Sequence, residues 1–433
     1  MAQTSSEPGA QAALTGTAAA VRCELCDRAL ELPPLAAGES ARCDRCGHRV
    51  TTFQDDMIQR AFALAGSGML LLLGAAAYPF LGVSKEGQVV QMTLFDSAMS
   101  LIEYREPVLG SVVFVLIFLL PLCLLLIQML LLTLLLLGRG GWLLSLLARA
   151  VLLLSAWNMV EVFLIGVLVS VAKLAGLATV QIGISFWCFL GFTLCTLAAL
   201  AILDPYQLWR QVERQRGLPR QTPPVAEAMS CHRCHRLLPR DSRGQRCPLC
   251  FSWVAPRFPY SVQRTLAYLL TAIVLYLPAN LLPLMVTTSF GSVTRSTIAG
   301  GILLLWQHGS YPTALVIFIA SLLVPILKII VLLWLCASVI RGQRHSRLER
   351  SHLYRVTEFV GRWSMVDVFV VALLVALFQF GTLLSVEPGA AALAFCGVVV
   401  FTMLAAQSFD PRLLWDSETE VASEAELLGS VPR

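Results

Sequence analysis

The heptapeptide WNMVEVF at residues 157–163 returns, nearly unchanged, as WSMVDVF at residues 363–369. The two copies lie 206 positions apart, and each places an acidic residue, Glu161 or Asp367, inside a run of apolar side chains. A match at this spacing, within a chain of 433 residues, indicates that the chain contains one unit twice.

Other landmarks recur at nearly the same spacing. Each half begins with two C-x-x-C pairs and continues into four apolar segments. Three pairs of landmarks carry the comparison further: Pro79 with Pro283, Pro121 with Pro325, and Asp204-Pro205 with Asp410-Pro411. The proline pairs are offset by 204 and the last pair by 206, so a two-residue insertion in the second half explains the difference.

The composition excludes a soluble globular protein. Of the residues, 57% are hydrophobic and only 14% are charged, and the mean hydropathy is +0.73. Several apolar runs are longer than about 18 residues, the length that crosses a bilayer as a helix. We therefore predict an all-α polytopic membrane protein with eight transmembrane helices, at residues 58–82, 107–137, 143–172, 177–203, 263–287, 311–340, 353–384 and 389–408.

The distribution of basic residues predicts the orientation. Arginines are concentrated between the fourth and fifth spans and after the sixth, whereas the opposite loops hold few cations. By the positive-inside rule, both cysteine modules and both termini face the cytoplasm, so the two four-helix repeats are parallel. The net charge of +5 is a topology signal of this kind and not a nucleic-acid footprint.

These features divide the chain into seven parts. They are a disordered tail (1–20), a first ribbon (21–52), transmembrane repeat 1 (57–204), a linker (205–228), a second ribbon (229–256), transmembrane repeat 2 (261–410) and a cytoplasmic tail (411–433). The outside loops, 83–106 and 288–310, contain short alternating stretches that are compatible with a hairpin or small sheet.

Eight of the thirteen cysteines form two ligand sets with the spacing of zinc ribbons. The first set is Cys23, Cys26, Cys43 and Cys46, and the second is Cys231, Cys234, Cys247 and Cys250. A reducing cytoplasm disfavours disulfides. Each four-cysteine set is complete without the nearby histidines, so we predict two structural Zn²⁺ ions, with iron or a redox role for the C-x-x-C pairs as alternatives.

Polar residues inside the predicted spans are candidate functional residues, because burying a charge in hydrocarbon is costly. Lys328 lies thirteen residues before Arg341, roughly 20 Å at 1.5 Å per residue, which is near mid-membrane. Lys328 and Asp367 lie on successive antiparallel spans and could pair, with Ser321 and Ser364 on the same helix faces. Two interpretations stay open: an ion pair that fixes helix register, or a pocket that handles a polar headgroup or relays a proton.

The first half lacks this full polar set. Asn158 and Glu161 match Ser364 and Asp367, but Leu124 and Ile117 stand where the second half has Lys328 and Ser321. The sequence contains no Walker A motif, no ATPase signature and no nucleophile constellation, so we do not expect an enzyme.

In this context, LPANLLP at residues 277–283 and RWSMVDVF at residues 362–369 are specific strings. With the duplicated cysteine modules, they make the chain resemble the paraquat-inducible protein A family of LetA-like bacterial inner-membrane proteins, from about residue 20 to 412. The resemblance implies a component of an intermembrane lipid transport system with an MCE-domain periplasmic tunnel protein and membrane phospholipids as partners. It also implies that Ser321, Lys328, Ser364 and Asp367 form a transport pocket. The alternatives are a membrane scaffold that only anchors the tunnel, and a proton-coupled small-solute exporter.

Overall fold

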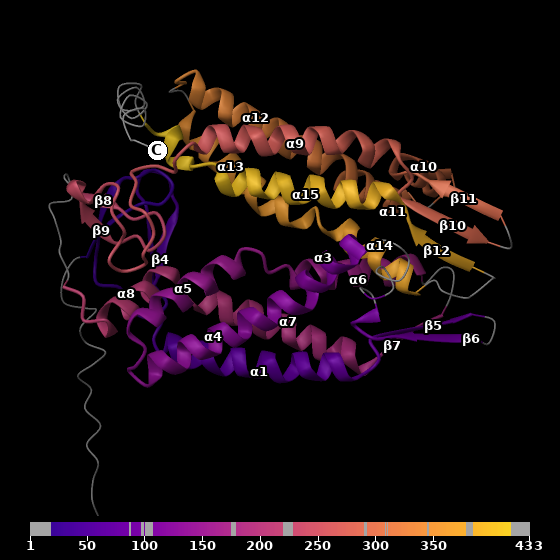
Figure 1. Ribbon diagram of the computed structural model, residues 1–433, viewed down its shortest axis with the longest axis horizontal. Coiled ribbons are helices and arrows are strands. Elements are labelled where there is room, and N and C mark those ends of the chain that lie inside the picture. The colour runs from indigo at the N-terminus through magenta and orange to yellow at the C-terminus, as the bar shows by residue number, and fades with distance from the viewer. Residues whose placement is uncertain are drawn as a thin grey trace, which may run out of the picture.

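The computed structural model describes residues 19–85, 88–96, 99, 107–174, 179–219, 228–289, 292–307, 309, 311–343, 346–377 and 384–416. The helices of the two halves lie in two groups side by side, with the cysteine modules gathered at one end and two small sheets at the other (Figure 1). We call these the ribbon end and the sheet end. The predicted disordered tail lies almost entirely outside the described residues, as does the chain beyond residue 416.

Transmembrane repeat 1 is built from apolar helices. Its elements are α1 (Met57–Ala77), α3 (Pro107–Phe114), the π-helical turn η2 (Val115–Leu119), α4 (Leu120–Leu136), α5 (Gly141–Ser155), α6 (Val160–Leu174) and α7 (Ile184–Ile202). The first and last of these, α1 and α7, pack along their lengths, and α4 packs between α1 and α5.

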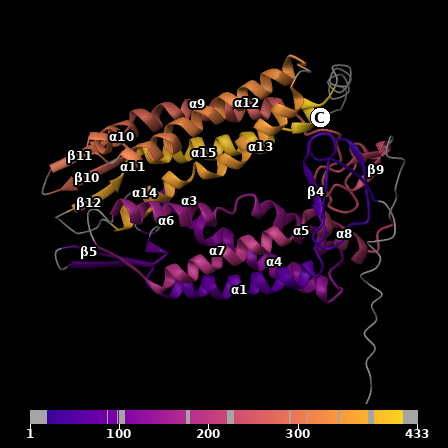
Figure 2. The same ribbon diagram turned by 180° about the vertical axis from the view of Figure 1, so that it is seen from behind.

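Transmembrane repeat 2 has the same order of elements. They are α9 (Ser261–Leu281), α10 (Ile298–Gln307), α11 (Tyr311–Ile317), the π-helical turn η4 (Phe318–Leu323), α12 (Val324–Ile340), α13 (Arg347–Trp363), α14 (Val366–Leu377) and α15 (Ala390–Ser408). Here α9 pairs with α15, as α1 pairs with α7 in the first repeat. The view from behind shows the same two groups (Figure 2).

Among the described residues, seven helical stretches are long and apolar enough to span a membrane. They are Met57–Ala77, Pro107–Leu136, Gly141–Val171, Ile184–Ile202, Ser261–Leu281, Phe318–Ile340 and Ala390–Ser408. The expected span 353–384 is divided between α13, which carries many charged residues, and α14, and residues 378–383 lie outside the described part. The chain is therefore a multi-pass, mostly helical membrane protein, and the eighth span stays a prediction.

The predicted outside hairpins are confirmed as two three-stranded antiparallel sheets. One contains β6 (Gln88–Met92), β5 (Leu81–Lys85) and β7 (Thr179–Ile182), and the other contains β11 (Ser292–Ser296), β10 (Met285–Ser289) and β12 (Leu384–Pro388), each in that order. Gly183 and Gly389 follow the third strand of each sheet. A Cβ atom on either glycine would overlap the carbonyl oxygen of Pro79 or Pro283, so both positions require glycine.

The second helix of each repeat is irregular at corresponding places. The π-helical turns η2 and η4 end just before Pro121 and Pro325, the prolines that correspond in the two halves. Proline lacks the N–H that an α-helix needs, and a widened turn accommodates the hydrogen bond that is lost. The duplicated prolines therefore position a duplicated irregular turn.

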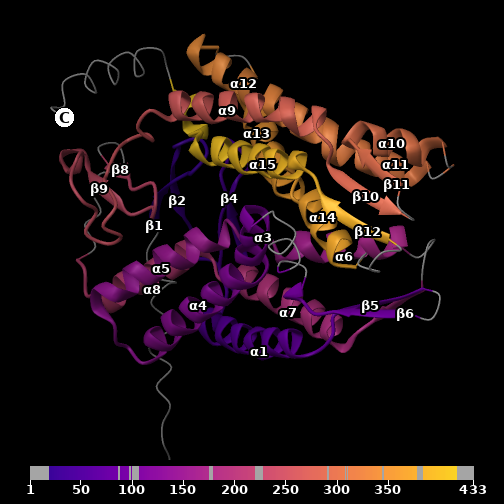
Figure 3. The ribbon, with the colours of Figure 1, turned by 45° about the vertical axis from the view of Figure 1, so that its right-hand side comes forward.

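The repeated heptapeptide lies where the two repeats meet. It leads into α6 in one copy and α14 in the other, and these two helices form the main contact between the repeats. Phe163 and Phe369 meet edge to face with ring centroids 5.5 Å apart, and a Cβ on Gly166 would lie 3.2 Å from the Cβ of Phe369. Seen from the side in Figure 3, the helices α6 and α14 lie between the two groups. The heptapeptide that reveals the duplication therefore also lies at the contact between the two repeats.

Two elements at the ribbon end were not anticipated. The segment expected as a linker begins with α8 (Pro205–Gln215), and the expected tail begins with the short 3-10 helix η5 (Pro411–Leu414). Each is capped by the aspartate of the repeated Asp-Pro pair. Asp204 accepts hydrogen bonds from Thr51 Oγ1 and the Thr52 amide, and Asp410 accepts one from the Phe258 amide. Each aspartate therefore fastens the chain that enters a repeat to the end of that repeat's last helix.

Candidate functional site

All four C-x-x-C pairs lie at the turns of short hairpins. The hairpins that hold the first three pairs are formed by the strands β1 (Ala19–Arg22) and β2 (Ala29–Leu32), β3 (Ser40–Arg42) and β4 (Arg49–Thr52), and β8 (Ala228–Ser230) and β9 (Leu237–Pro239). The fourth pair lies between the bridged residues Arg246 and Trp253, after the 3-10 helix η3 (Arg240–Ser242). In each turn the carbonyl of the first cysteine accepts a hydrogen bond from the residue four positions later, which has a positive φ; these residues are Asp27, Gly47, His235 and Phe251. Four copies of one turn thus present eight thiols in equivalent ways.

The turns gather the cysteines into the two predicted sets. In each set the four sulfur atoms lie within 4.8 Å of one another, and all eight residues are buried. Two sulfur–sulfur distances in ribbon 1 are 3.5 Å, and in ribbon 2 they are 3.5 and 3.6 Å. Tetrahedral zinc with Zn–S bonds of about 2.3 Å requires sulfurs about 3.8 Å apart. The residues therefore fit a structural Zn²⁺ in each ribbon.

The thiols of ribbon 2 are chemically suited to metal binding. Hydrogen bonds from Cys234, Cys247 and Cys250 lower the pKa of the Cys231 thiol, whereas burial raises the pKa of Cys234. Ser252 Oγ lies 3.3 Å from the sulfur of Cys231 and 2.9 Å from that of Cys250. The hydrogen bonds to Cys231 favour its thiolate, which is the form that binds a metal.

Lys328 is a buried cation within the second span of repeat 2. It lies in α12 with only 4% of its surface exposed, and its Nζ donates no hydrogen bond to any described residue. Its side chain runs across Gly361 of α13, where a Cβ would lie 2.5 Å from Nζ. The absence of a side chain at residue 361 therefore makes room for the lysine.

Glu358 was missed by sequence reasoning. It precedes Gly361, which lies against Lys328, by three residues, so both lie on one face of α13. The predicted span 353–384 contains Glu358, but apolar length does not indicate which side chains of this helix face α12. Its relevance becomes visible only once the structure shows that Gly361, on the same face of α13, lies against Lys328.

The structure locates the other three predicted pocket residues but does not establish a contact between them and Lys328. Ser321 is buried in η4, and Ser364 is buried between α13 and α14, with an Oγ that has no hydrogen-bond partner among the described residues. Asp367 is the second residue of α14, and its side chain is outside what the structure describes. The Lys328–Asp367 pair stays a prediction.

Repeat 1 contains its own buried polar residues at other positions. Leu124, which matches Lys328, is fully buried in apolar surroundings. One turn further along α4, Gln128 is also fully buried, and neither its Oε1 nor its Nε2 is hydrogen-bonded within the described ranges. Asn158 is buried as well, at the turn between α5 and α6. Sequence comparison with the second half did not single out Gln128, because its counterpart there is Leu332.

Fold and site together define a multi-pass membrane protein made of a duplicated helical unit, in which a four-cysteine ribbon precedes each copy. Comparison with known proteins agrees, because the profile described as "Paraquat-inducible protein A" matches the chain twice, at residues 58–213 and 262–418. The chain belongs to the paraquat-inducible protein A family.

Three relatives illustrate the range of similarity. The "Intermembrane transport protein PqiA" of Escherichia coli K12 is 40% identical over 416 residues, which cover 93% of this chain and 97% of the relative. The "Lipophilic envelope-spanning tunnel protein A" of the same strain is 31% identical over 92% of this chain and 91% of the relative. A "Probable intermembrane transport protein" of Haemophilus influenzae is 28% identical, with 91% and 95% covered. No solved structure matches the chain.

Proposed function

We propose that the chain is an inner-membrane component of an intermembrane lipid transport system. In this role it passes lipids to or from a periplasm-spanning MCE-domain tunnel through a polar pocket in repeat 2. The names of its relatives, "Intermembrane transport protein PqiA" and "Lipophilic envelope-spanning tunnel protein A", support this assignment. The distribution of arginines supports a ribbon end in the cytoplasm and a sheet end in the periplasm, where the two sheets are available to the tunnel protein.

The observation that carries the proposal is the buried Lys328. A lysine within an apolar span is expensive, and such residues commonly mark a substrate or proton path. Its neighbours fit this role, because the adjoining turn η4 is π-helical, Gly361 leaves space over the side chain, and Glu358 supplies an acid toward the ribbon end. We assign Lys328 to a phosphate headgroup or a transferred proton, with Glu358, Ser321, Ser364 and Asp367 along the same path.

The metal centres belong to the architecture of the protein and not to its transport chemistry. Four cysteine ligands fill the coordination sphere of Zn²⁺, which leaves no position for a substrate. A bound Zn²⁺ would supply folding free energy to modules that are too small to hold a core of their own.

The test is lipid transfer from inner-membrane vesicles to the tunnel partner, measured with the Lys328→Ala, Glu358→Gln and Asp367→Asn variants. The matched control is Leu124→Ala, which truncates the corresponding residue of repeat 1. Our proposal expects at least a tenfold loss of transfer for Lys328→Ala with tunnel assembly unchanged. Normal transfer with Lys328→Ala would reject the pocket and favour the scaffold, and intact transfer with Asp367→Asn would remove that residue from the path.

A further inference from the structure

Ribbon 2 docks on the repeat that comes before it in the chain. Arg149 of α5 donates a hydrogen bond to the carbonyl oxygen of Cys250 at 3.1 Å. Arg216, directly after α8, donates to the Leu249 carbonyl at 2.7 Å and lies 4.9 Å from the ring of Phe251. The four cysteines of ribbon 2 belong to the same apolar cluster as the ribbon-end residues of α4, α5 and α8. The second knuckle of ribbon 2, residues 247–250, is thus seated on repeat 1.

Ribbon 1 reaches the other repeat. Its cysteines share an apolar cluster with Trp415, the residue after η5 at the end of repeat 2. The guanidinium of Arg45, between the two cysteines of the second knuckle, lies 4.6 Å from the Trp415 ring. Trp415 in turn donates from Nε1 to Ser351 Oγ of α13 at 2.9 Å. The second knuckle of ribbon 1, residues 43–46, is thus seated on repeat 2.

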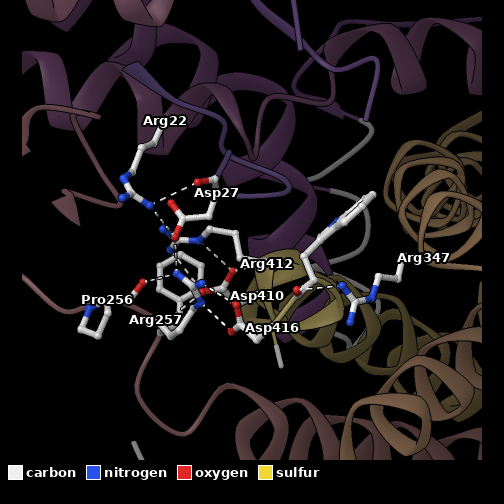
Figure 4. A network of polar contacts seen from close by, with 10 residues as sticks. Arg22, Asp27, Pro256, Arg257, Arg347, Asp410, Arg412 and Asp416 are labelled. Atoms are coloured by element: carbon white, nitrogen blue, oxygen red, sulfur yellow. Dashed lines mark hydrogen bonds and ion pairs between the residues drawn. The ribbon is translucent and has the colours of Figure 1, made fainter. Parts of the chain in front are cut away.

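A charged network closes the arrangement (Figure 4). Arg257, which leads from ribbon 2 into repeat 2, donates to Asp27 of ribbon 1 at 2.9 Å and to the two carboxylate oxygens of Asp416 at 2.5 and 2.8 Å. The ribbons also touch directly, because His235 Nε2 lies 3.1 Å from Glu24 Oε1. One arginine therefore joins ribbon 1, the entry to repeat 2 and the segment that follows repeat 2.

The two docking sites correspond under the duplication. Cys46 and Cys250 differ by the offset of 204, and α5 and α13 are the same element in the two repeats. Asp204 ties ribbon 1 to the end of repeat 1, and Asp410 ties Phe258, just after ribbon 2, to the end of repeat 2. Each ribbon rests its second knuckle on the other repeat. The ribbons are therefore exchanged between the repeats.

We propose that the metal-loaded ribbons form a crossed clasp. Ribbon 1 holds the ribbon end of repeat 2, and ribbon 2 holds the ribbon end of repeat 1. Loss of metal from one ribbon releases the repeat that this ribbon holds. The proposal rests on the metal sites proposed above. Its physical basis is that a module of about thirty residues loses its fold with its metal, so its docking surface disappears. With the clasp closed, the repeats can separate at the sheet end while they stay joined at the ribbon end.

The test is hydrogen exchange of the full-length protein in lipid nanodiscs, with the metal content of each variant measured in parallel. Cys43→Ser should lose one metal equivalent and raise exchange at least tenfold in residues 411–416, with residues 141–150 unchanged. Cys247→Ser should also lose one metal equivalent, but it should raise exchange at least tenfold in residues 141–150, with residues 411–416 unchanged. An uncrossed pattern, in which Cys247→Ser exposes residues 411–416 and leaves residues 141–150 protected, would overturn the clasp.

A second variant separates the clasp from the metal. Arg257→Ala should keep both metal equivalents and still raise exchange in residues 411–416. The control is Arg243→Ala, which truncates an exposed arginine of ribbon 2 whose side chain makes no hydrogen bond or ion pair with described residues. Unchanged exchange in Arg257→Ala would overturn the clasp, whereas two cysteine variants that retain full metal would overturn its metal dependence and the proposed zinc sites.

Discussion

Replacement of Lys328 by methionine distinguishes a structural lock from a functional site by the sign of one measurement. Methionine has nearly the length of the lysine stem and can follow the same course over Gly361 without the ammonium group. If Lys328 serves transport, its burial is a cost that the fold carries. If it is one member of a locking ion pair, its removal leaves a buried acid uncompensated.

The two cases predict changes of opposite sign in the free energy of unfolding when Lys328 is replaced by methionine. A lysine at the centre of a membrane helix costs about 3 kcal/mol, so Lys328→Met should stabilise the protein by about that amount, or roughly 100-fold in the unfolding equilibrium. Breaking a buried salt bridge from one side instead destabilises by about 3–5 kcal/mol. We expect stabilisation, because Nζ donates no hydrogen bond to any described residue, so methionine gives up no polar contact there.

The assay is reversible unfolding of the purified protein in mixed detergent micelles, together with lipid transfer to the tunnel partner. Leu124→Met is the matched control, since it places the same side chain at the corresponding site of repeat 1 and should change stability by less than about 1.5 kcal/mol. A more stable Lys328→Met variant that transfers no lipid supports the reasoning. A variant destabilised by several kcal/mol would refute it and show that the lysine is a lock.

Three further outcomes follow from the packing and the metal sites. Gly183→Ala should strongly reduce the yield of folded protein on size-exclusion chromatography, because its Cβ would overlap the Pro79 carbonyl, whereas Gly301→Ala, in open space within a helix, should be neutral or stabilising by up to about 1 kcal/mol. Gly166→Leu should lower the thermal unfolding midpoint by forcing α6 away from Phe369 of α14, and an unchanged midpoint would show that the repeats do not rely on this contact. Exhaustive chelation should remove two equivalents of zinc per chain, measured by elemental analysis, and a content of one or none would contradict the four-cysteine assignment.

Much of the architecture is predictable because the chain contains the same unit twice. Spans, ribbons and outside hairpins each produce a local signal of apolar length, cysteine spacing or alternation, and the duplication repeats that signal. The element α8 gave no such signal, since a polar helix of eleven residues resembles a linker until its apolar side is known to pack on the ribbon end.

The site was less accessible to sequence reasoning. Lys328 could be found because a charge in an apolar run is conspicuous in any sequence. Glu358 and Gly361 could not, since their relevance depends on which face of α13 meets α12, and a charged helix near the membrane surface does not reveal its inner face. The exchange of the ribbons could not be predicted either, because the cysteine spacing within a ribbon does not indicate which repeat that ribbon contacts.

The contact between α6 and α14 has an evolutionary consequence. It is made by two copies of the same heptapeptide and the helices that follow, with Phe163 against its own counterpart Phe369. A surface that meets its own copy in this way is isologous, the kind of surface that joins identical subunits about a two-fold axis. A one-repeat ancestor would have buried the same helix as a homodimer. With both copies in one chain, repeat 2 can carry Lys328 where repeat 1 has Leu124, an asymmetry that a dimer of identical chains cannot have.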